Sequence, residues 1–498
     1  MICDGALLLS RHARERQWGH RMRFNLRQAH ARTCASFVFL ALLTLALGSA
    51  SRAADAGDSR PAARQSPDWL RDAVIYEVFP RAFSPSGDLK AVTTQLDRLK
   101  DLGVDVLWLM PIHPIGRQKA KGTLGSPYAV RDYDAIDPAY GAADDLKQLV
   151  AAAHRRDMKV FIDIVANHTA WDSVLIEKHA DWYRRDASGH IVSPNPDWVD
   201  VAQLDYSNPA LREYMSGMLV RWLRDYGLDG FRCDYASGVP RDFWESVRPE
   251  LDRVRPGLAF LAEADDPALL HSAFDIDYAW DFYHAVSNAI AGRAPASLVR
   301  AAWERAEARY PRGALRLRFS DNHDQLRTTG QAGLPAALAA SALMFTLDGV
   351  PLLYNGMEVG DTTESTAPAL FERVPIQWDM AERRPHVAAF YKSLASLRRA
   401  HPALTRGVVR WLSNDDEQRV LSYERVGGGE SLVVVINLSS LPFAGIVDTD
   451  AGAFQDVTPD WQSSGKASPA SRNARRASAL PAVFLAPWEF RVFSRGAP

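Results

Sequence analysis

The feature that most constrains the fold of this chain is a regular alternation of short apolar segments with longer amphipathic ones. Eight apolar segments have the length and composition of buried strands, at 73–79, 104–110, 160–165, 230–233, 258–262, 274–278, 315–319 and 350–354. Between most of them, apolar residues recur at helical spacing, over 88–102, 142–156, 209–226, 241–254 and 335–346. This pattern predicts an α/β fold in which eight parallel strands close into a (β/α)8 TIM barrel. A doubly wound open sheet is the alternative, but no glycine-rich phosphate loop follows the first segment.

Two stretches interrupt this alternation. The interval 169–208 is too long for a simple loop and carries several tryptophans, so we expect a small inserted subdomain (subdomain B) after the third strand. Beyond residue 400, strand-like segments at 408–412, 420–424, 432–437 and 489–493 are separated by turn signals. We therefore expect the barrel to span 68–400 and an antiparallel β-sandwich domain to span 401–498.

The N-terminus has the pattern of an export signal. Several arginines precede an apolar run over 36–48, and small residues follow it up to Ala54. This order predicts a secretory signal peptide over 1–53, followed by a polar linker over 54–67. The apolar run is shorter than the roughly 20 residues that span a bilayer, and an uncleaved anchor is the alternative. We expect a periplasmic or extracellular protein with no stable membrane partner.

The cysteine content limits the possible disulfides, and the net charge limits the possible partners. Three cysteines are present, and removal of the signal would leave only Cys233, so no intramolecular disulfide is predicted. The formal net charge of −2 over 498 residues gives no indication of a nucleic-acid partner. Nothing in the sequence indicates an oligomeric state.

Charged side chains follow several predicted strands at their carboxyl ends. Asp234 and Glu263 come directly after the fourth and fifth strands, Asp324 shortly after the seventh, and His168 shortly after the third. The carboxyl ends of all strands meet at one face of a TIM barrel, where active sites form. A pair of carboxyl groups is the equipment for cleaving a glycosidic bond. The sequence therefore predicts a carboxylate-based active site at that face.

Taken in order, these segments resemble the α-amylase family of glycoside hydrolases (glycoside hydrolase family 13). The resemblance covers the chain from about Ile75 to its end. It rests on four segments at predicted strand ends, 163–168, 230–234, Glu263 and 322–324, and on the eighth-strand segment 349–358. The inserted subdomain and the C-terminal β-sandwich agree with the three-part layout of that family.

The resemblance implies a role for each carboxylate. Asp234 would be the nucleophile and Glu263 the general acid and then the base. Asp324 would bind sugar hydroxyls and stabilise the positively charged transition state. Arg232 lies two residues before Asp234, so both side chains face the same way, and its guanidinium would keep that carboxylate charged.

The same resemblance places three further residues at the sugar. His168 and His323 would hydrogen-bond the sugar at the cleavage subsite, and Tyr128 would stack on it. Ser237 and Gly238 depart from the family, because many members carry a Lys-His pair there that contacts the sugar beyond the scissile bond. The resemblance therefore does not predict the contacts on that side.

A structural Ca²⁺ between the barrel and the inserted subdomain is a further expectation from the resemblance. Its oxygen ligands would come from Asn167, Asp205 and the backbone carbonyl of Gly238. The alternative for Asn167 is a hydrogen bond that fixes its own loop.

We expect an exported, retaining α-glucan hydrolase that cleaves α-glucosidic bonds in starch-derived maltooligosaccharides through a covalent glycosyl-enzyme. Retention predicts carboxyl groups of Asp234 and Glu263 about 5–5.5 Å apart. A transglycosidase, an α-glucosidase or a cyclomaltodextrinase of the same family would share this mechanism. A non-catalytic glycan-binding barrel is the alternative from another class, which the presence of all three carboxylates disfavours.

Overall fold

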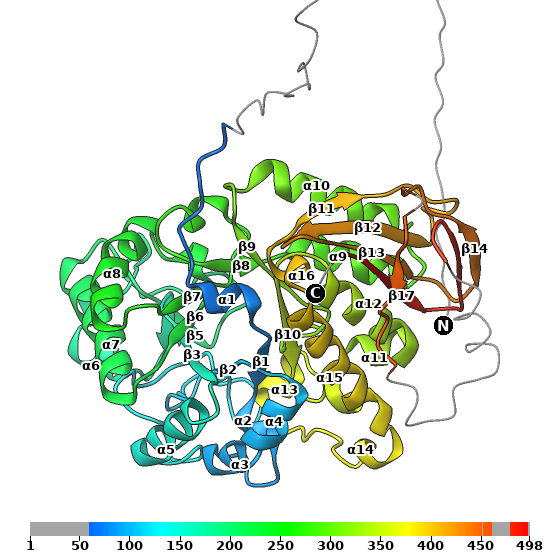
Figure 1. Ribbon diagram of the computed structural model, residues 1–498. Coiled ribbons are helices and arrows are strands. Elements are labelled where there is room, and N and C mark those ends of the chain that lie inside the picture. Colours follow the sequence, from blue (N-terminus) through cyan, green and yellow to red (C-terminus); the bar gives the residue numbers. More distant parts are fainter. Residues whose placement is uncertain (1–58, 451, 461–478, 497–498) are drawn as a thin grey trace, which may run out of the picture. The chain divides into compact units, whose positions relative to one another are not determined.

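A closed barrel of eight parallel strands forms the centre of the protein. The computed structural model describes residues 59–450, 452–460 and 479–496, so the predicted signal peptide and the first part of the linker lie outside them. The strands lie in the order β1-β10-β9-β8-β7-β6-β3-β2, and β10 closes the ring on β1 (Figure 1). Their bounds are β1 Ile75–Val78, β2 Val106–Leu109, β3 Lys159–Val165, β6 Gly230–Asp234, β7 Ala259–Ala262, β8 Ile276–Tyr278, β9 Leu315–Arg318 and β10 Val350–Tyr354. The predicted TIM barrel is confirmed.

The alternation of side chains along each strand decides what enters the barrel. Ile75, Phe161 and Leu352 belong to the apolar cluster inside the ring, whereas their neighbours Tyr76 and Ile162 belong to the cluster beneath the helices. Successive side chains of a strand point to opposite faces. Glu77 and Asp163, two positions after Ile75 and Phe161, therefore share the interior near the carboxyl ends of their strands, and both belong to the site described below.

Helices cover the outside of the barrel. The longer ones are α3 Leu89–Thr94, α4 Leu96–Leu102, α5 Ala143–His154, α7 Pro209–Tyr226, α8 Arg241–Val254, α9 Trp280–Ile290, α10 Ser297–Arg309, α12 Leu334–Thr346 and α15 Pro385–Ala400. The short ones are α1 Asp68–Asp72, α2 Pro80–Phe83, α11 Thr328–Ala332, α13 Ala367–Phe371, α14 Met380–Arg383 and α16 Pro402–Arg406. The helix expected over 88–102 is divided at Gln95, and α9, α10 and α15 were not predicted. No helix in the described ranges is both long enough and apolar enough to cross a membrane.

Local signals set the bounds of α7, which leads into the strand that carries Asp234. Asn208 caps its start by accepting a hydrogen bond from the backbone of Ala210, and Pro209 stands at the first helical position. Gly227 ends it in a left-handed conformation with φ of 68°. Residues 209–226 are therefore helical, as the sequence predicts.

The stretch between β3 and α7 carries its own small elements. β4 His168–Ala170 and β5 Val201–Gln203 pair in an antiparallel two-stranded sheet, with α6 Val174–Lys178 between them in sequence. His168 therefore begins this stretch, directly above the carboxyl end of β3.

Antiparallel strands make up the C-terminal region. A five-stranded sheet has the order β11-β12-β13-β17-β15, and β14 and β16 pair separately. Their bounds are β11 Val408–Trp411, β12 Val420–Gly427, β13 Glu430–Asn437, β14 Phe443–Ile446, β15 Gln455–Asp456, β16 Ala482–Leu485 and β17 Phe490–Arg495. The sheet contacts α12, where Tyr423 shares a 2.5 Å hydrogen bond with Thr346 and Arg425 donates to the carbonyl of Thr346. The expected fold class, a TIM barrel with a C-terminal β-domain, is confirmed.

Candidate active site

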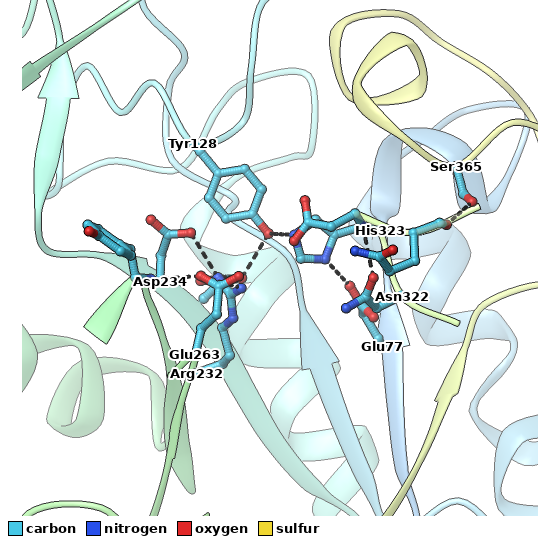
Figure 2. A network of polar contacts seen from close by, with 12 residues as sticks. Glu77, Tyr128, Arg232, Asp234, Glu263, Asn322, His323 and Ser365 are labelled. Atoms are coloured by element: carbon cyan, nitrogen blue, oxygen red, sulfur yellow. Dashed lines mark hydrogen bonds and ion pairs between the residues drawn. The ribbon is translucent and has the colours of Figure 1, made fainter. Parts of the chain in front are cut away.

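One guanidinium, that of Arg232, holds three carboxylates at the carboxyl ends of the barrel strands. Its Nη1 lies 2.9 Å from Asp163 Oδ1 and 3.1 Å from Asp234 Oδ1, and its Nη2 lies 3.0 Å from Glu263 Oε2. Arg232 is fully buried, and Asp234 is 8% exposed. Figure 2 shows the side chains of Arg232, Asp234 and Glu263 converging, with Tyr128 between them and His323. The predicted nucleophile and acid are therefore brought to the same cation.

Burial raises the pKa values of the carboxyl groups of Glu263 and Asp234. Burial raises the pKa of Glu263 to about 7, where Arg232 opposes the shift and the charges of Asp234 and Asp324 add to it. Burial also raises the pKa of Asp234 above its ordinary value, although Arg232 draws it back. The sequence predicts that Arg232 keeps Asp234 charged. The positive charge of Arg232 does lower the pKa of Asp234, but burial raises that pKa by more. A carboxyl with a pKa near 7 is suited to give and take a proton at neutral pH.

His323 is held by a carboxylate that sequence reasoning missed. Its Nδ1 lies 2.5 Å from Oε1 of Glu77, a fully buried residue of β1, and its Nε2 lies 3.2 Å from Asp324 Oδ2. Burial alone would lower the pKa of His323, but the carboxylates of Asp324 and Glu77 outweigh it and raise that pKa to about 9. His323 is therefore a cation at neutral pH. A single glutamate within the otherwise apolar strand 75–78 is the sequence signal that could have identified Glu77.

Tyr128 and His168 also reach the site. The hydroxyl of Tyr128 lies 2.7 Å from His323 Nε2 and donates to Asp163 at 3.2 Å, and its ring stacks on His323 with centroids 5.2 Å apart. His168 Nε2 lies 3.9 Å from Asp234 Oδ2. Burial lowers the pKa of His168 to about 4, so it is neutral where His323 is charged.

These side chains open into one cavity of about 390 Å³. Such a volume lies within the range of small-molecule pockets. Six of the seven residues predicted for catalysis and sugar binding line it, namely Tyr128, His168, Asp234, Glu263, His323 and Asp324, and Arg232 lies beneath it. The structure thus brings together residues from four strand ends and from the loop after β2.

Comparison with known proteins agrees with this arrangement. The sequence profile described as the α-amylase catalytic domain matches residues 55–411. The chain belongs to the α-amylase family. It is 30% identical over 397 residues to an α-amylase of Haloarcula japonica, which aligns with 76% of this chain but only 57% of that protein. The expected glycoside hydrolase class is confirmed at the level of the family.

Two further members of the family are similar along most of their length. A cyclomaltodextrinase of a Bacillus species is 29% identical over 421 residues, covering 75% of this chain and 74% of that protein. The crystal structure of a noncanonic maltogenic α-amylase from Thermotoga neapolitana superposes with a TM-score of 0.74 at 32% identity, covering 86% of this chain and 97% of the other.

In this α-amylase family member, other residues that sequence reasoning did not assign also line the cavity. Trp198 and Asp200 come from the inserted stretch, Lys121 from the loop after β2, and Tyr235 from the position after Asp234. Lys121 pairs with Asp200 at 3.1 Å, which ties the loop to the inserted stretch. Tyr235 is adjacent to Asp234 in the sequence, but only the fold reveals Lys121, Trp198 and Asp200 as neighbours, because no spacing relates them to the site.

The residues expected to bind Ca²⁺ fit that ion only in part. The side-chain oxygen of Asn167 faces Gly238, since a Cβ at Gly238 would lie 2.7 Å from it. The Asn167 amide nitrogen lies 3.2 Å from His168 Nδ1, and the carboxylate of Asp205 accepts a hydrogen bond from the backbone of Ser207. Ca²⁺ takes six to eight oxygens, and the described residues contain no group of three or more His, Cys, Asp or Glu side chains that could hold a metal. A calcium role for Asn167 and Asp205 stays a prediction.

Proposed function

We propose that this protein is a retaining α-glucan hydrolase that cleaves α-glucosidic bonds in maltooligosaccharides through a covalent glycosyl-enzyme. The observation that carries the proposal is the contact of Arg232 with both Asp234 and Glu263, with Asp324 and His323 around the same cavity. Two carboxyl groups in one small site, one of them with a pKa near 7, are the equipment for cleaving a glycosidic bond, and their contact with one guanidinium supports the short separation that retention uses.

In the first step, an oxygen of Asp234 forms a bond to the anomeric carbon and the bond from that carbon to the glycosidic oxygen breaks. Protonated Glu263 gives its proton to the departing oxygen. Positive charge develops on the sugar ring in the transition state, and the carboxylates of Asp234 and Asp324 stabilise it. His323, a cation held by Glu77, and neutral His168 would hydrogen-bond the sugar hydroxyls.

In the second step, water attacks the anomeric carbon and the ester bond to Asp234 breaks. The now ionised Glu263 takes the proton of that water and returns to its starting state. An incoming sugar hydroxyl in place of water gives transfer instead of hydrolysis. A transglycosidase, an α-glucosidase or a cyclomaltodextrinase therefore has the same site chemistry, and substrate preference distinguishes them. Export, which the N-terminal pattern predicts, is part of the proposal.

Product analysis tests the proposal. The enzyme is incubated with maltooligosaccharides, cyclodextrins, pullulan and trehalose, the products are separated by chromatography, and their anomeric form is followed by proton NMR. Retention gives the α-anomer first, before mutarotation. First release of the β-anomer would refute the covalent mechanism.

Two substitutions connect the activity to the site. Asp234→Asn should retain no more than a few per cent of kcat, because an amide cannot form the glycosyl ester. Asp144→Asn, on an exposed residue of α5, is the matched control and should be fully active. Comparable activity of Asp234→Asn would refute the assignment of the nucleophile. Inactivity of the wild type on every α-glucan, with intact fold, would favour the glycan-binding alternative.

A further inference from the structure

A buried cluster of charged side chains lies outside the barrel wall, behind the strand end that carries the general acid. Asp277 of β8 and Arg316 of β9 point outward here, because their neighbours along each strand belong to the apolar cluster inside the ring. We infer that Tyr310, which follows α10 and stands at the centre of this cluster, is a positioning residue that holds Glu263 in place at the glycosidic oxygen. The inference rests on the proposed function and adds to it the group that places the acid.

The hydroxyl of Tyr310 lies between two carboxylates. It is 2.5 Å from Oδ1 of Asp265 and 2.8 Å from Oδ2 of Asp277. Burial and the charge of Asp277 raise the pKa of Tyr310, so the hydroxyl keeps its hydrogen. One hydrogen can be donated to only one of the two carboxylates. Both contacts are hydrogen bonds only if one carboxyl carries a proton of its own and donates it to Tyr310.

The surrounding charges decide which carboxyl holds this proton. Burial raises the pKa of Asp277 to about 7. Arg316 and the Tyr310 hydrogen bond oppose this shift, and the charge of Asp265 adds to it. Burial acts on the pKa of Asp265 in the same direction, but the hydrogen bond from Tyr310 and the charges of the nearby arginines outweigh it and lower that pKa. Below about pH 7, Asp277 therefore donates to Tyr310, and Tyr310 donates to ionised Asp265.

Asp265 follows the general acid by two residues and is also held by two arginines. Its Oδ1 lies 3.1 Å from Nη2 of Arg316. Its Oδ2 lies 3.1 Å from Nη1 of Arg309, whose Nη2 donates to the Asp265 carbonyl at 2.6 Å. The backbone of Glu263 is held on the other side, where its N–H and its carbonyl hydrogen-bond to β6 and to the turn after it at 3.0 and 3.1 Å. The segment that carries the acid is therefore fastened at both ends.

The cluster reaches the active site by a second route, through Arg316. The Cζ of Arg316 lies 3.6 Å from the centroid of the Tyr310 ring, and its Nη2 donates to the carbonyl of Tyr278 at 2.6 Å. The side chain of Tyr278 belongs to the apolar cluster inside the barrel, and its hydroxyl accepts a 3.3 Å hydrogen bond from Nε of Arg232. Arg232 is the cation that contacts both the nucleophile and the acid. Tyr310 thus acts on the acid along the chain and on its cation through the barrel wall.

The experiment separates placement of the acid from the rest of the chemistry. Cleavage of maltotriose needs a proton from Glu263, because a sugar alkoxide is a poor leaving group. With α-maltosyl fluoride, Asp234 forms its bond to the anomeric carbon, the bond to fluorine breaks, and fluoride leaves with the electron pair and without a proton. For both substrates, kcat/KM reports the path from free enzyme and substrate to this bond cleavage. The ratio of the two kcat/KM values therefore measures how well the acid is placed.

We expect Tyr310→Phe to lower kcat/KM on maltotriose by about tenfold or more, and on α-maltosyl fluoride by less than about twofold. The assay is run at pH 6, below the Asp277 pKa of about 7. The ring keeps its contact with Arg316, whereas the two carboxylates lose the hydroxyl between them. Asp265→Asn weakens the same hold from the other side and should change the ratio in the same direction.

Two variants control for other causes. Asp277→Asn is the conservative one, because its amide is neutral like the protonated carboxyl and can still donate to Tyr310, so it should keep the wild-type ratio. Tyr423→Phe is the matched control. It removes another fully buried tyrosine hydroxyl, which bonds to Thr346 at the C-terminal sheet, and should leave both kcat/KM values as in the wild type.

Each other outcome overturns a defined statement. Equal losses on both substrates in Tyr310→Phe, or no loss on either, would show that Tyr310 supports the fold alone. A ratio in Asp277→Asn as low as that of Tyr310→Phe would refute the shared proton. If the wild type releases no fluoride, or Asp234→Asn releases it equally fast, the proposed function itself fails.

Discussion

Glu263→Gln should make the protein more stable at alkaline pH, and the gain should disappear in acid. The pKa of Glu263 rises from its ordinary 4.5 to about 7 in the folded protein, so the folded state holds this proton more tightly than the unfolded chain does. Ionisation of Glu263 therefore costs stability as the pH rises through this window. The cost is absent below pH 4.5 and complete above pH 7. An amide stays neutral and avoids it.

The magnitude follows from the same shift. One pKa unit corresponds to about 1.4 kcal/mol, and a pKa raised from 4.5 to about 7 therefore corresponds to about 3 kcal/mol at high pH. The side chain is 19% exposed, so solvent screens this cost only weakly. For a protein of this size, we expect a melting temperature that rises by a few degrees at pH 8.

Thermal unfolding of the wild type and Glu263→Gln at pH 4.5, 6 and 8 measures the effect. Glu213→Gln, on an exposed residue of α7, is the matched control and should not change the melting temperature at any of these values. A difference between wild type and Glu263→Gln that is the same at all three pH values would refute the reasoning. So would a variant that is less stable at pH 8 than at pH 4.5 relative to the wild type.

Three further outcomes follow from the site and the sequence. Glu77→Gln should lower kcat/KM by about tenfold or more, since a hydrogen bond between charged groups contributes about 1.5–3 kcal/mol. It should also move the loss of the His323 proton from pH 9 to lower pH, and an unchanged pH profile of activity would contradict the role of Glu77. N-terminal sequencing of the protein from its native host should find a mature chain that begins near Ala54, whereas an intact N-terminus in a membrane fraction would favour the anchor. If Asn167 and Asp205 bind Ca²⁺, a chelator should lower the melting temperature and added Ca²⁺ should restore it, because the ion stabilises the folded state by about 2.7 kcal/mol at a hundredfold excess over Kd. A melting temperature indifferent to both would contradict the calcium site.

Much of the barrel could be predicted because its signals are local. Most strands are short and largely apolar, and α7 is bounded by residues that start or stop a helix wherever they stand. The place of Asp234 and Glu263 in the fold could be predicted for the same reason, since a charged residue at the carboxyl end of a buried barrel strand must lie at the barrel's active face. The helices α9 and α10 were missed in an interval where the strand pattern itself was weak.

The rest of the site depends on contacts between distant parts of the chain. Glu77 and His323 are 246 positions apart, and no spacing relates them. The reason for glycine at 238 is likewise spatial, because the Cβ is excluded by the Tyr235 ring and by Asn167. The resemblance to the family identified Gly238 as a departure from the usual histidine. Only the three-dimensional contacts explain why glycine stands there.

The way the barrel closes has a consequence for how the chain is made. β1 finds one of its two neighbours in β10, the last barrel strand, and the side chains of α12 over 336–346 are all buried. Strand β13, which ends at Asn437, packs against part of α12. A nascent chain that has reached residue 400 can close its ring but still presents an apolar helix to water, and such surfaces attract other chains. The covering of α12 therefore waits until β13 has been synthesised, and a protein shortened to its barrel should aggregate instead of forming a smaller working enzyme.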